Sequence, residues 1–122
     1  MKTKKAIATI RITDLKVRTI IGINPWERKT KQDVMINIAL DVDAGRAVRS
    51  DDITDAVDYK TITKKIIAAV KNSDFFLLEK LTDMVLRLVM TNPKVIRASV
   101  RVDKPRALRF AKSVSVELHA SR

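Results

Sequence analysis

Residues Asp33 to Asp43 read Asp-Val-Met-Ile-Asn-Ile-Ala-Leu-Asp-Val-Asp, and they alternate strictly between two sets of side chains. One set is apolar and the other is mostly polar: Val34, Ile36, Ile38, Leu40 and Val42 against Asp33, Met35, Asn37, Ala39 and Asp41. Successive side chains of a β-strand point to opposite faces, so this period of two predicts a half-buried strand. The stretch therefore predicts a sheet with one covered face and one open face.

The same period appears in three other stretches of the chain. It runs over residues 6–21, where it is interrupted near Asp14, and again over residues 96–103 and 114–120. The interruption predicts one long N-terminal strand kinked by a bulge at Asp14. The core-facing side chains of the last two strands are expected to be Ile96, Ala98, Val100 and Val102, followed by Val114, Val116, Leu118 and Ala120.

Between the second and third predicted strands the apolar period becomes helical. Asp58 suits the N-cap of a helix that follows Tyr59, and residues 72–74 (Asn-Ser-Asp) separate it from a second helix that ends before Pro93. The apolar positions are Ile62, Ile66, Ile67 and Val70 in the first helix and Leu78, Leu81, Val85, Leu88 and Val89 in the second. The order ββααββ predicts an α+β fold, in which a four-stranded antiparallel sheet carries two helices on one face.

Length and composition restrict the classes of protein to consider. With 122 residues, two glycines and three prolines, the chain is expected to form one domain over residues 1–122 with no flexible linker. There is no apolar block of about 20 residues, and the basic start over residues 1–5 lacks a signal-type apolar core, so a cytoplasmic protein is expected. Cysteine is absent and His119 is the only histidine, which argues against a metal site, and we expect no cofactor.

The chain is strongly basic, with 25 Lys and Arg against 14 Asp and Glu and a net charge of +11. The excess is +3 over residues 1–61 and +8 over residues 62–122. Such a charge attracts nucleic acids, lipid headgroups or phosphorylated metabolites, or it serves solubility alone. A nucleic-acid-binding module is an alternative interpretation, which the net charge and the Lys and Arg on a sheet face support. The five aromatic residues do not form the strand-borne stacking pattern of single-strand readers, so we expect no nucleic acid as partner. The lack of an apolar block of about 20 residues argues against a membrane.

The side of the predicted sheet away from the helices is polar, so it faces water or another subunit. Its edge strands have hydrogen-bonding groups to spare, which favours strand-to-strand assembly of several copies into a larger barrel. The residues that define this face are Arg97, Ser99, Arg101, Ser113, Ser115, Glu117 and His119.

Four residues at the ends of predicted elements are candidates for chemistry: Glu27, Tyr59, Glu79 and Lys104. A rigid scaffold aims side chains at such positions, so function concentrates there. Each also has an ordinary structural interpretation. In the same order, these are a solvated loop acid, a side chain that fills the seam between helix and sheet, a first-turn carboxylate that favours the helix dipole, and a charge that ends a strand.

Several motifs resemble those of the dihydroneopterin aldolase family. Residues 21–27 (Ile-Gly-Ile-Asn-Pro-Trp-Glu), followed by 32–34 (Gln-Asp-Val), resemble its first signature, and residues 50–59 (Ser-Asp-Asp-Ile-Thr-Asp-Ala-Val-Asp-Tyr) resemble its second. Residues 76–81 (Phe-Leu-Leu-Glu-Lys-Leu) are similar to its pterin-anchoring helix start, and residues 102–105 (Val-Asp-Lys-Pro) to its catalytic lysine segment. The resemblance covers nearly the whole chain.

Within the family, residues 103–115 look more like the dihydroneopterin triphosphate 2′-epimerase branch than the aldolase branch. They read Asp-Lys-Pro-Arg-Ala-Leu-Arg-Phe-Ala-Lys-Ser-Val-Ser. The Gly-containing segment after the lysine and the Val-Gly-Val-type last strand of aldolases are both absent. The other motifs are equally compatible with either branch.

The resemblance implies the tunnelling fold, in which subunits form a tetrameric barrel that usually stacks as an octamer, with pterin sites between neighbouring subunits. It implies that Glu79 anchors the pterin ring and that backbone N–H groups at the same helix start, near Leu78, bond the pterin carbonyl. Lys104 would be the base, Tyr59 a proton relay that also contacts substrate, and Glu27 a holder of the substrate side chain or of water. An ordinary lysine titrates near about 10.4, so we expect burial or the neighbouring arginines to lower the pKa of Lys104.

The implied reaction is epimerisation at C2′ of 7,8-dihydroneopterin triphosphate to 7,8-dihydromonapterin triphosphate, by retro-aldol cleavage and re-addition. The alternative is an aldolase that releases 6-hydroxymethyl-7,8-dihydropterin and glycolaldehyde, and a purely structural assembly subunit is a third interpretation. A triphosphate gives a basic site a handle for retaining the aldehyde fragment, which suggests Arg106, Arg109 and Lys112 as its ligands. The alternative is that these cations are solvated loop charges.

Overall fold

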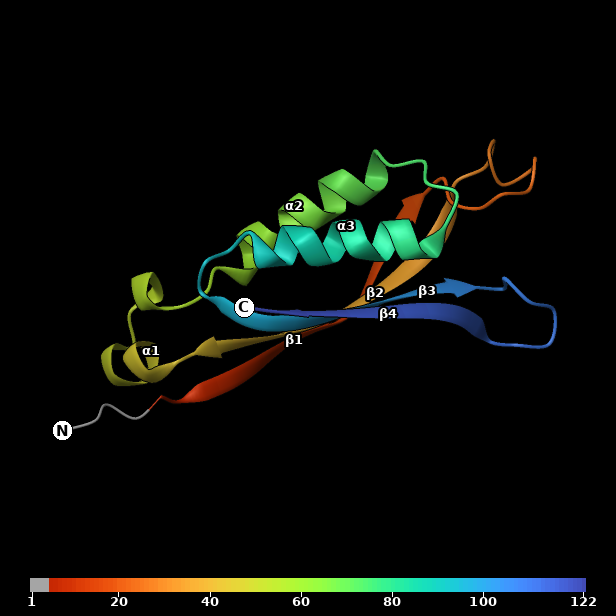
Figure 1. Ribbon diagram of the computed structural model, residues 1–122. Coiled ribbons are helices and arrows are strands. Elements are labelled where there is room, and N and C mark those ends of the chain that lie inside the picture. Colours follow the sequence, from red (N-terminus) through yellow and green to blue (C-terminus); the bar gives the residue numbers. More distant parts are fainter. Residues whose placement is uncertain (1–4) are drawn as a thin grey trace.

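The computed structural model describes residues 5–122; residues 1–4 of the basic start lie outside the described part. The elements in chain order are β1 (Ile7–Thr19), β2 (Gln32–Asp43), α1 (Gly45–Ser50), the 3₁₀ turn η1 (Ile53–Asp55), α2 (Tyr59–Lys71), α3 (Leu78–Met90), β3 (Val95–Pro105) and β4 (Ser113–Ser121). The strands form one antiparallel sheet in the order β1-β2-β3-β4, and α2 and α3 lie across one of its faces (Figure 1). The predicted α+β architecture is confirmed.

The core lies between the sheet and the two long helices. The alternating face of β2 is almost completely buried, with Val34, Ile36 and Leu40 at 0% exposure. The helices contribute Ile62, Ile66, Val70, Leu81, Val85 and Val89 to the same core. The period of two in β2 and the helical period after Tyr59 therefore predict correctly which side chains of the sheet and of the helices form the core.

The predicted bulge in β1 is confirmed at Asp14. The pairing of β1 with β2 shifts register between Ile12 and Leu15, and Asp14 adopts a left-handed backbone with φ 56°. The Asn37 side-chain oxygen accepts a hydrogen bond from the Asp14 N–H at 2.9 Å, which satisfies the donor that the bulge removes from the ladder.

One core-facing assignment in β3 is wrong. A register shift between Asp41 and Val42 pairs Val42 with Val95, and Val95 is fully buried while Ile96 is only half-buried. The strict alternation holds from Ala98 onward. The shift arises from pairing with β2, so the period within β3 alone does not reveal it.

The two long helices begin differently. Asp58 caps α2 as expected, because its carboxylate accepts a hydrogen bond from the Thr61 N–H at 3.0 Å. In α3 the N-cap residue is Leu77, whose side chain makes no capping hydrogen bond, so the first-turn N–H groups have no side-chain partner at the cap. The short α1 and η1, which precede α2, were not predicted from the sequence.

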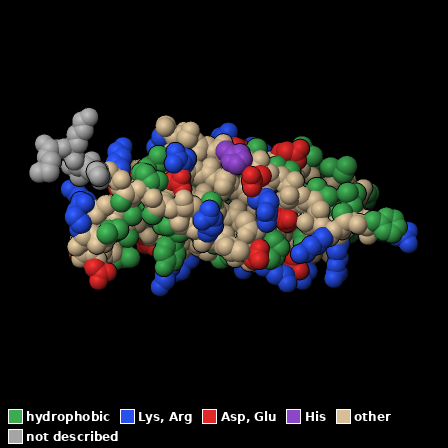
Figure 2. Space-filling view, turned by 90° about the horizontal axis from the view of Figure 1, so that it is seen from below, with side chains coloured by type: hydrophobic (Ala, Val, Ile, Leu, Met, Phe, Trp, Pro, Cys, Tyr) green, Lys and Arg blue, Asp and Glu red, His purple; other side chains and the backbone are tan. Residues whose placement is uncertain are grey.

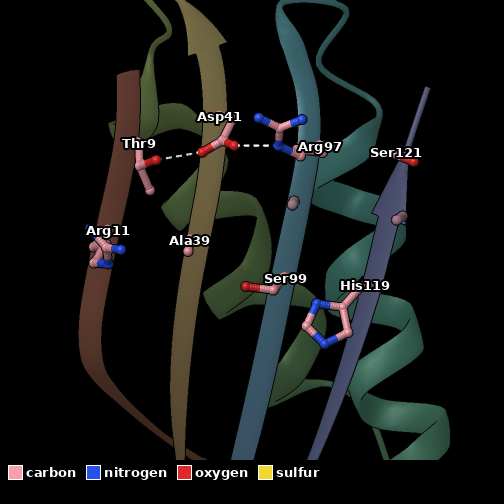
Figure 3. A pocket seen from close by; sticks show the side chains of 10 residues that line it. Thr9, Arg11, Ala39, Asp41, Arg97, Ser99, His119 and Ser121 are labelled. Carbon is pink, nitrogen blue, oxygen red and sulfur yellow. Dashed lines mark hydrogen bonds and ion pairs between the residues drawn. The ribbon is translucent and has the colours of Figure 1, made fainter. Parts of the chain in front are cut away.

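The open face of the sheet is polar, as expected, and some of its charges are paired, such as Arg97 with Asp41 and Arg101 with Asp103. Figure 2 shows Lys and Arg side chains next to Asp and Glu side chains across this face. In the pocket of Figure 3, Asp41 accepts hydrogen bonds from Thr9 at 2.6 Å and from Arg97 at 2.5 Å, and these bonds lower the pKa of its carboxyl. None of the helices within residues 5–122 is long and apolar enough to cross a membrane.

Candidate functional site

An ion pair between Glu27 and Lys104 forms at one end of the sheet. The Lys104 Nζ donates to Glu27 Oε2 across 77 positions of sequence. Glu27 is only 3% exposed, and the Lys104 side chain is 13% exposed. The interpretation of Glu27 as a solvated loop acid is therefore wrong, and two of the predicted catalytic residues lie in direct contact.

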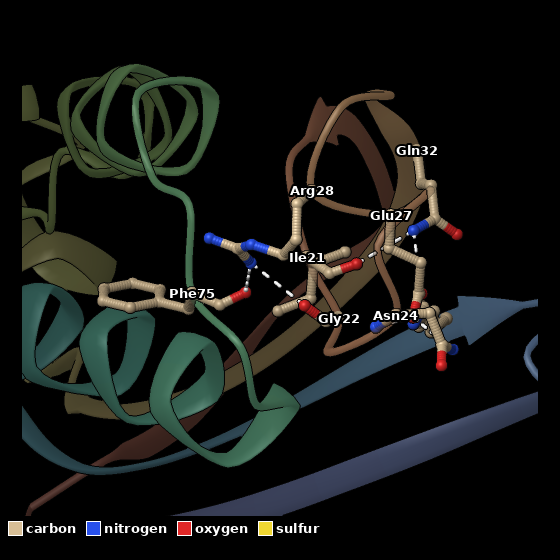
Figure 4. Close-up of polar contacts among 8 residues, drawn as sticks. Ile21, Gly22, Asn24, Glu27, Arg28, Gln32 and Phe75 are labelled. Carbon is tan, nitrogen blue, oxygen red and sulfur yellow. Dashed lines mark hydrogen bonds and ion pairs between the residues drawn. The ribbon is translucent and has the colours of Figure 1, made fainter.

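The loop between β1 and β2 holds the Glu27 carboxylate in place (Figure 4). Asn24 donates to Oε1 from its backbone N–H at 3.2 Å and from its side chain at 2.8 Å. Gln32 donates to Oε2 at 3.0 Å and also to the Ile21 carbonyl at 2.9 Å. Gly22 has φ 124°, and any side chain there would collide with this carboxylate, so only glycine permits the arrangement.

These contacts set the protonation state of Glu27. Burial alone would raise the pKa of its carboxyl, but the hydrogen bonds from Lys104, Gln32 and the Asn24 backbone, together with the Lys104 charge, outweigh burial and lower the pKa to about 2. The group is a carboxylate throughout the physiological pH range. It serves the pair as a fixed negative charge and not as an acid.

The lowered pKa predicts an acid-dependent contribution to stability. Because the folded pKa of about 2 lies below the ordinary pKa of 4.5, the Glu27 contribution is complete above pH 4.5 and is lost as the pH falls towards 2. We expect the unfolding free energy difference between wild type and Glu27→Gln to shrink by about 2 to 3 kcal/mol over this window. Urea unfolding of both proteins at several pH values between 5 and 2 measures it. A difference independent of pH would contradict the assignment.

Arg28 ties the same loop to the start of α3. Its guanidinium donates to the carbonyls of Gly22 at 3.0 Å, Phe75 at 3.1 Å and Asp74 at 2.5 Å, and it lies 4.0 Å from the centroid of the Phe76 ring. The N-terminus of α3 is thereby held at the end of the sheet that carries Glu27 and Lys104. The sequence did not identify Arg28, because its partners are backbone carbonyls, and two of the three, those of Asp74 and Phe75, are 46 and 47 positions away, which leaves no local pattern.

Leu78 and Glu79 form the first turn of α3, so they lie at this end of the molecule. Glu79 is exposed and Leu78 is half-buried. The Leu78 carbonyl accepts from the buried Thr82 hydroxyl at 2.7 Å, which keeps the first turn closed. A carboxylate beside helix N–H groups combines hydrogen-bond acceptors and donors on one small surface.

Tyr59 lies elsewhere in the same chain. Its ring is 50% exposed and lines a small pocket of about 170 Å³ with Ala8, Ile10 and Asp43, beside the opposite end of β2 from Gln32. At about 3.4 Å per residue, the strand separates the two levels by roughly 25 to 30 Å. A single chain therefore does not bring Tyr59 to Lys104.

The three predicted phosphate ligands occupy the exposed turn that follows Lys104. Arg106 has a left-handed backbone with φ 64°, and its N–H bonds the Lys112 carbonyl at 3.4 Å. Arg109 lies 5.4 Å from the centroid of the Phe110 ring, which is 96% exposed. The turn follows Lys104 directly in the sequence, so it lies next to the Glu27–Lys104 pair.

Known proteins are similar to this chain over nearly its whole length. The model of the family described as dihydroneopterin aldolase matches residues 10–119. A dihydroneopterin triphosphate 2′-epimerase of Pseudomonas aeruginosa is 49% identical over 121 residues, covering 99% of this chain and 98% of that protein. The protein of the same name from Escherichia coli K12 is 46% identical over 115 residues, covering 94% and 96%.

The fold comparison points the same way. The structure of Escherichia coli dihydroneopterin aldolase in complex with neopterin superposes with a TM-score of 0.89 at 26% identity, covering 93% of this chain and 99% of that chain. The sequence is thus more similar to the two epimerases than to this aldolase, while the fold is shared with both groups.

Proposed function

The chain belongs to the dihydroneopterin aldolase family, and we propose that it inverts C2′ of 7,8-dihydroneopterin triphosphate to give 7,8-dihydromonapterin triphosphate. The 49% identity to the Pseudomonas epimerase over almost the whole chain carries this proposal. The Glu27–Lys104 pair supports it, because it offers an amine as a base and a carboxylate that holds the amine in position. Cleavage of unphosphorylated dihydroneopterin is the second candidate, because aldolases share the family and the fold.

Glu79 and the first turn of α3 bind the pterin ring in this proposal. The 2-amino group and the adjacent ring N–H of a pterin are two donors in one plane, and a carboxylate accepts both. The N–H groups near Leu78 face the pterin carbonyl, since the N-cap side chain of α3 does not occupy them.

Lys104 acts on the substrate side chain. Removal of the 2′-hydroxyl proton lets the C1′–C2′ bond break, and the bonding electrons pass into the protonated ring imine. The neutral amine form of Lys104 accepts this proton, directly or through a water, and the ammonium that forms is paired with the Glu27 carboxylate, which fixes the position of Nζ from the other side. The aldehyde fragment, which carries the triphosphate, then turns and re-adds through its other face, and the proton returns to the new 2′-oxygen.

The site is completed by Tyr59 from a second copy. β1 and β4 are the edge strands of the sheet, and pairing of such edges between copies closes a barrel. A tetrameric ring, stacked as an octamer, is the assembly we propose. In this assembly one copy supplies the Tyr59 phenol to the site of its neighbour. Within a single chain, Tyr59 lies roughly 25 to 30 Å from Lys104.

Mixed oligomers test this shared site. Lys104→Met and Tyr59→Phe should each lose activity by about 10²-fold or more. Co-expression with different affinity tags should restore about a quarter of wild-type activity in the doubly purified oligomers, because random mixing leaves that share of sites with both native groups. Activity no greater than that of the parent variants would show that both residues act from one chain or that Tyr59 takes no part.

The cations after Lys104 hold the phosphates in this proposal. Arg109→Ala with Lys112→Ala is expected to lower kcat/KM for the triphosphate by about tenfold or more, and to increase release of the aldehyde fragment. The unphosphorylated substrate serves as the control, because it lacks the group these cations bind. Unchanged kinetics with the triphosphate would show that both side chains are solvated and do not bind the phosphates.

One product assay tests the function itself. The protein is incubated with dihydroneopterin triphosphate and, separately, with dihydroneopterin, and oxidised products are separated by a method that resolves the 2′ epimers. Formation of the triphosphate epimer with little 6-hydroxymethylpterin supports the epimerase. Dominant cleavage of the unphosphorylated compound would instead make the protein an aldolase.

A further inference from the structure

A basic groove lies on the open side of the sheet, next to the Glu27–Lys104 pair. It encloses about 560 Å³, within the range of roughly 300 to 1,000 Å³ that is typical of small-molecule sites. Lys16 and Arg18 of β1, Lys31 of the β1–β2 loop and Arg106 after β3 contribute its cations. We call these four residues, with the cavity they line, the basic groove.

The charges of the basic groove are poorly compensated. Asp33 is its one carboxylate, and it lies 3.6 Å from the Lys16 Nζ and 3.9 Å from the Arg18 Nε, so it shares weak pairing between two cations. Both side chains remain about two-thirds exposed, at 64% and 65%. Lys31 and Arg106 make no ion pair within residues 5–122. The uncompensated positive charge of the basic groove favours the binding of an anion.

The basic groove is physically connected to the reacting groups. Gln32 lines it and donates from Nε2 to Glu27 Oε2 at 3.0 Å. Arg106 also lines it and follows Lys104 by two positions, after Pro105. In the substrate, the first phosphorus follows C2′ after only one carbon and one oxygen. A side chain held at Lys104 therefore has its phosphates close to this groove.

We infer that the basic groove, through Lys16, Arg18 and Lys31 as well as Arg106, binds the polyphosphate of the substrate. This inference rests on the proposed epimerase function. It adds three cations from β1 and the β1–β2 loop to the turn after Lys104. Binding there keeps the cleaved aldehyde fragment attached while its carbonyl turns, which separates epimerisation from release.

The test compares two double variants that remove equal charge. Lys16→Gln with Lys31→Gln removes two of the four cations of the basic groove. Lys64→Gln with Lys65→Gln removes two exposed cations from α2, on the helical side of the sheet. Turnover of dihydroneopterin triphosphate and of unphosphorylated dihydroneopterin is measured for both variants and the wild type. Inorganic tripolyphosphate is used as a competitive inhibitor.

The groove variant should lose roughly 30- to 100-fold in kcat/KM for the triphosphate, and inhibition by tripolyphosphate should weaken by a similar factor. Its turnover of the unphosphorylated compound, and both activities of the α2 variant, should stay within about twofold of wild type. Equal losses on both substrates, or no loss on either, would overturn the inference. A wild type that does not epimerise the triphosphate would instead overturn the proposed function.

Discussion

Lys104→Met is expected to lower kcat for epimerisation by roughly 10³-fold, with little change in pterin affinity. Methionine has a similar length but cannot accept the 2′-hydroxyl proton, and the pterin-binding surface at Glu79 is untouched. A loss confined to kcat is the signature of an interaction made in the transition state. Steady-state kinetics and equilibrium titration with neopterin measure the two effects separately.

The variant also leaves the buried Glu27 carboxylate without its cation. Removing one partner of a buried pair costs about 3 to 5 kcal/mol, so Lys104→Met alone is expected to be less stable. The double variant Lys104→Met with Glu27→Gln removes the unpaired charge and should recover much of that stability. It should remain inactive, which separates the loss of the base from a loss of folding.

Retention of more than about a tenth of wild-type kcat by the folded double variant would remove Lys104 as the base. In that case the Glu27–Lys104 pair would be a structural clasp between the β1–β2 loop and β3. The buried carboxylate and its several donors would then serve to hold the loop in place.

Glu79→Gln is expected to weaken pterin binding by about 10² to 10³-fold, because the neutral amide turns one acceptor into a donor that opposes the 2-amino group. Neopterin fluorescence titration measures the dissociation constant. Stability should change by less than about 1 kcal/mol, since Glu79 is exposed and its main structural contribution is to the helix dipole.

Asp83→Asn is the matched control on the same helix. It removes the same charge one turn further along α3, where Asp83 pairs with Arg87 at 2.9 Å. Pterin affinity within about twofold of wild type is expected, because an exposed i,i+4 pair contributes only a few tenths of a kcal/mol. Equal weakening in both variants would mean that the charge of α3 matters and that Glu79 itself does not anchor the ring.

The sequence predicted the layers of this fold well, because the signals are local. Strict alternation in β2 and helical spacing after Tyr59 come from residues a few positions apart, which is the range over which a strand or helix repeats. The bulge at Asp14 was visible for the same reason. The burial of Val95 in place of Ile96 was not visible in the sequence, because that register depends on the neighbouring strand.

The candidate site was predicted in part. Resemblance to family motifs pointed to Glu27 and Lys104, but the residues alone favoured a solvated Glu27, which is in fact 3% exposed. The supporting contacts of Asn24, Arg28 and Gln32 carried no signal that assigned them a role. Their partners are a carboxylate and backbone carbonyls that only the folded loop brings near.

By itself, the sequence determined the order of the strands and the two long helices, the buried face of β2, the start of α2 and the family. Only the tertiary structure decided that Glu27 is buried against Lys104, that Tyr59 lies at the far end of the sheet, and that Lys16 and Lys31 share a groove with Arg106. The physical reason is distance along the chain. Periodicity records which way each side chain points from its own element, whereas burial, pairing and charge clustering depend on segments as much as 77 positions apart that meet only after the sheet has formed.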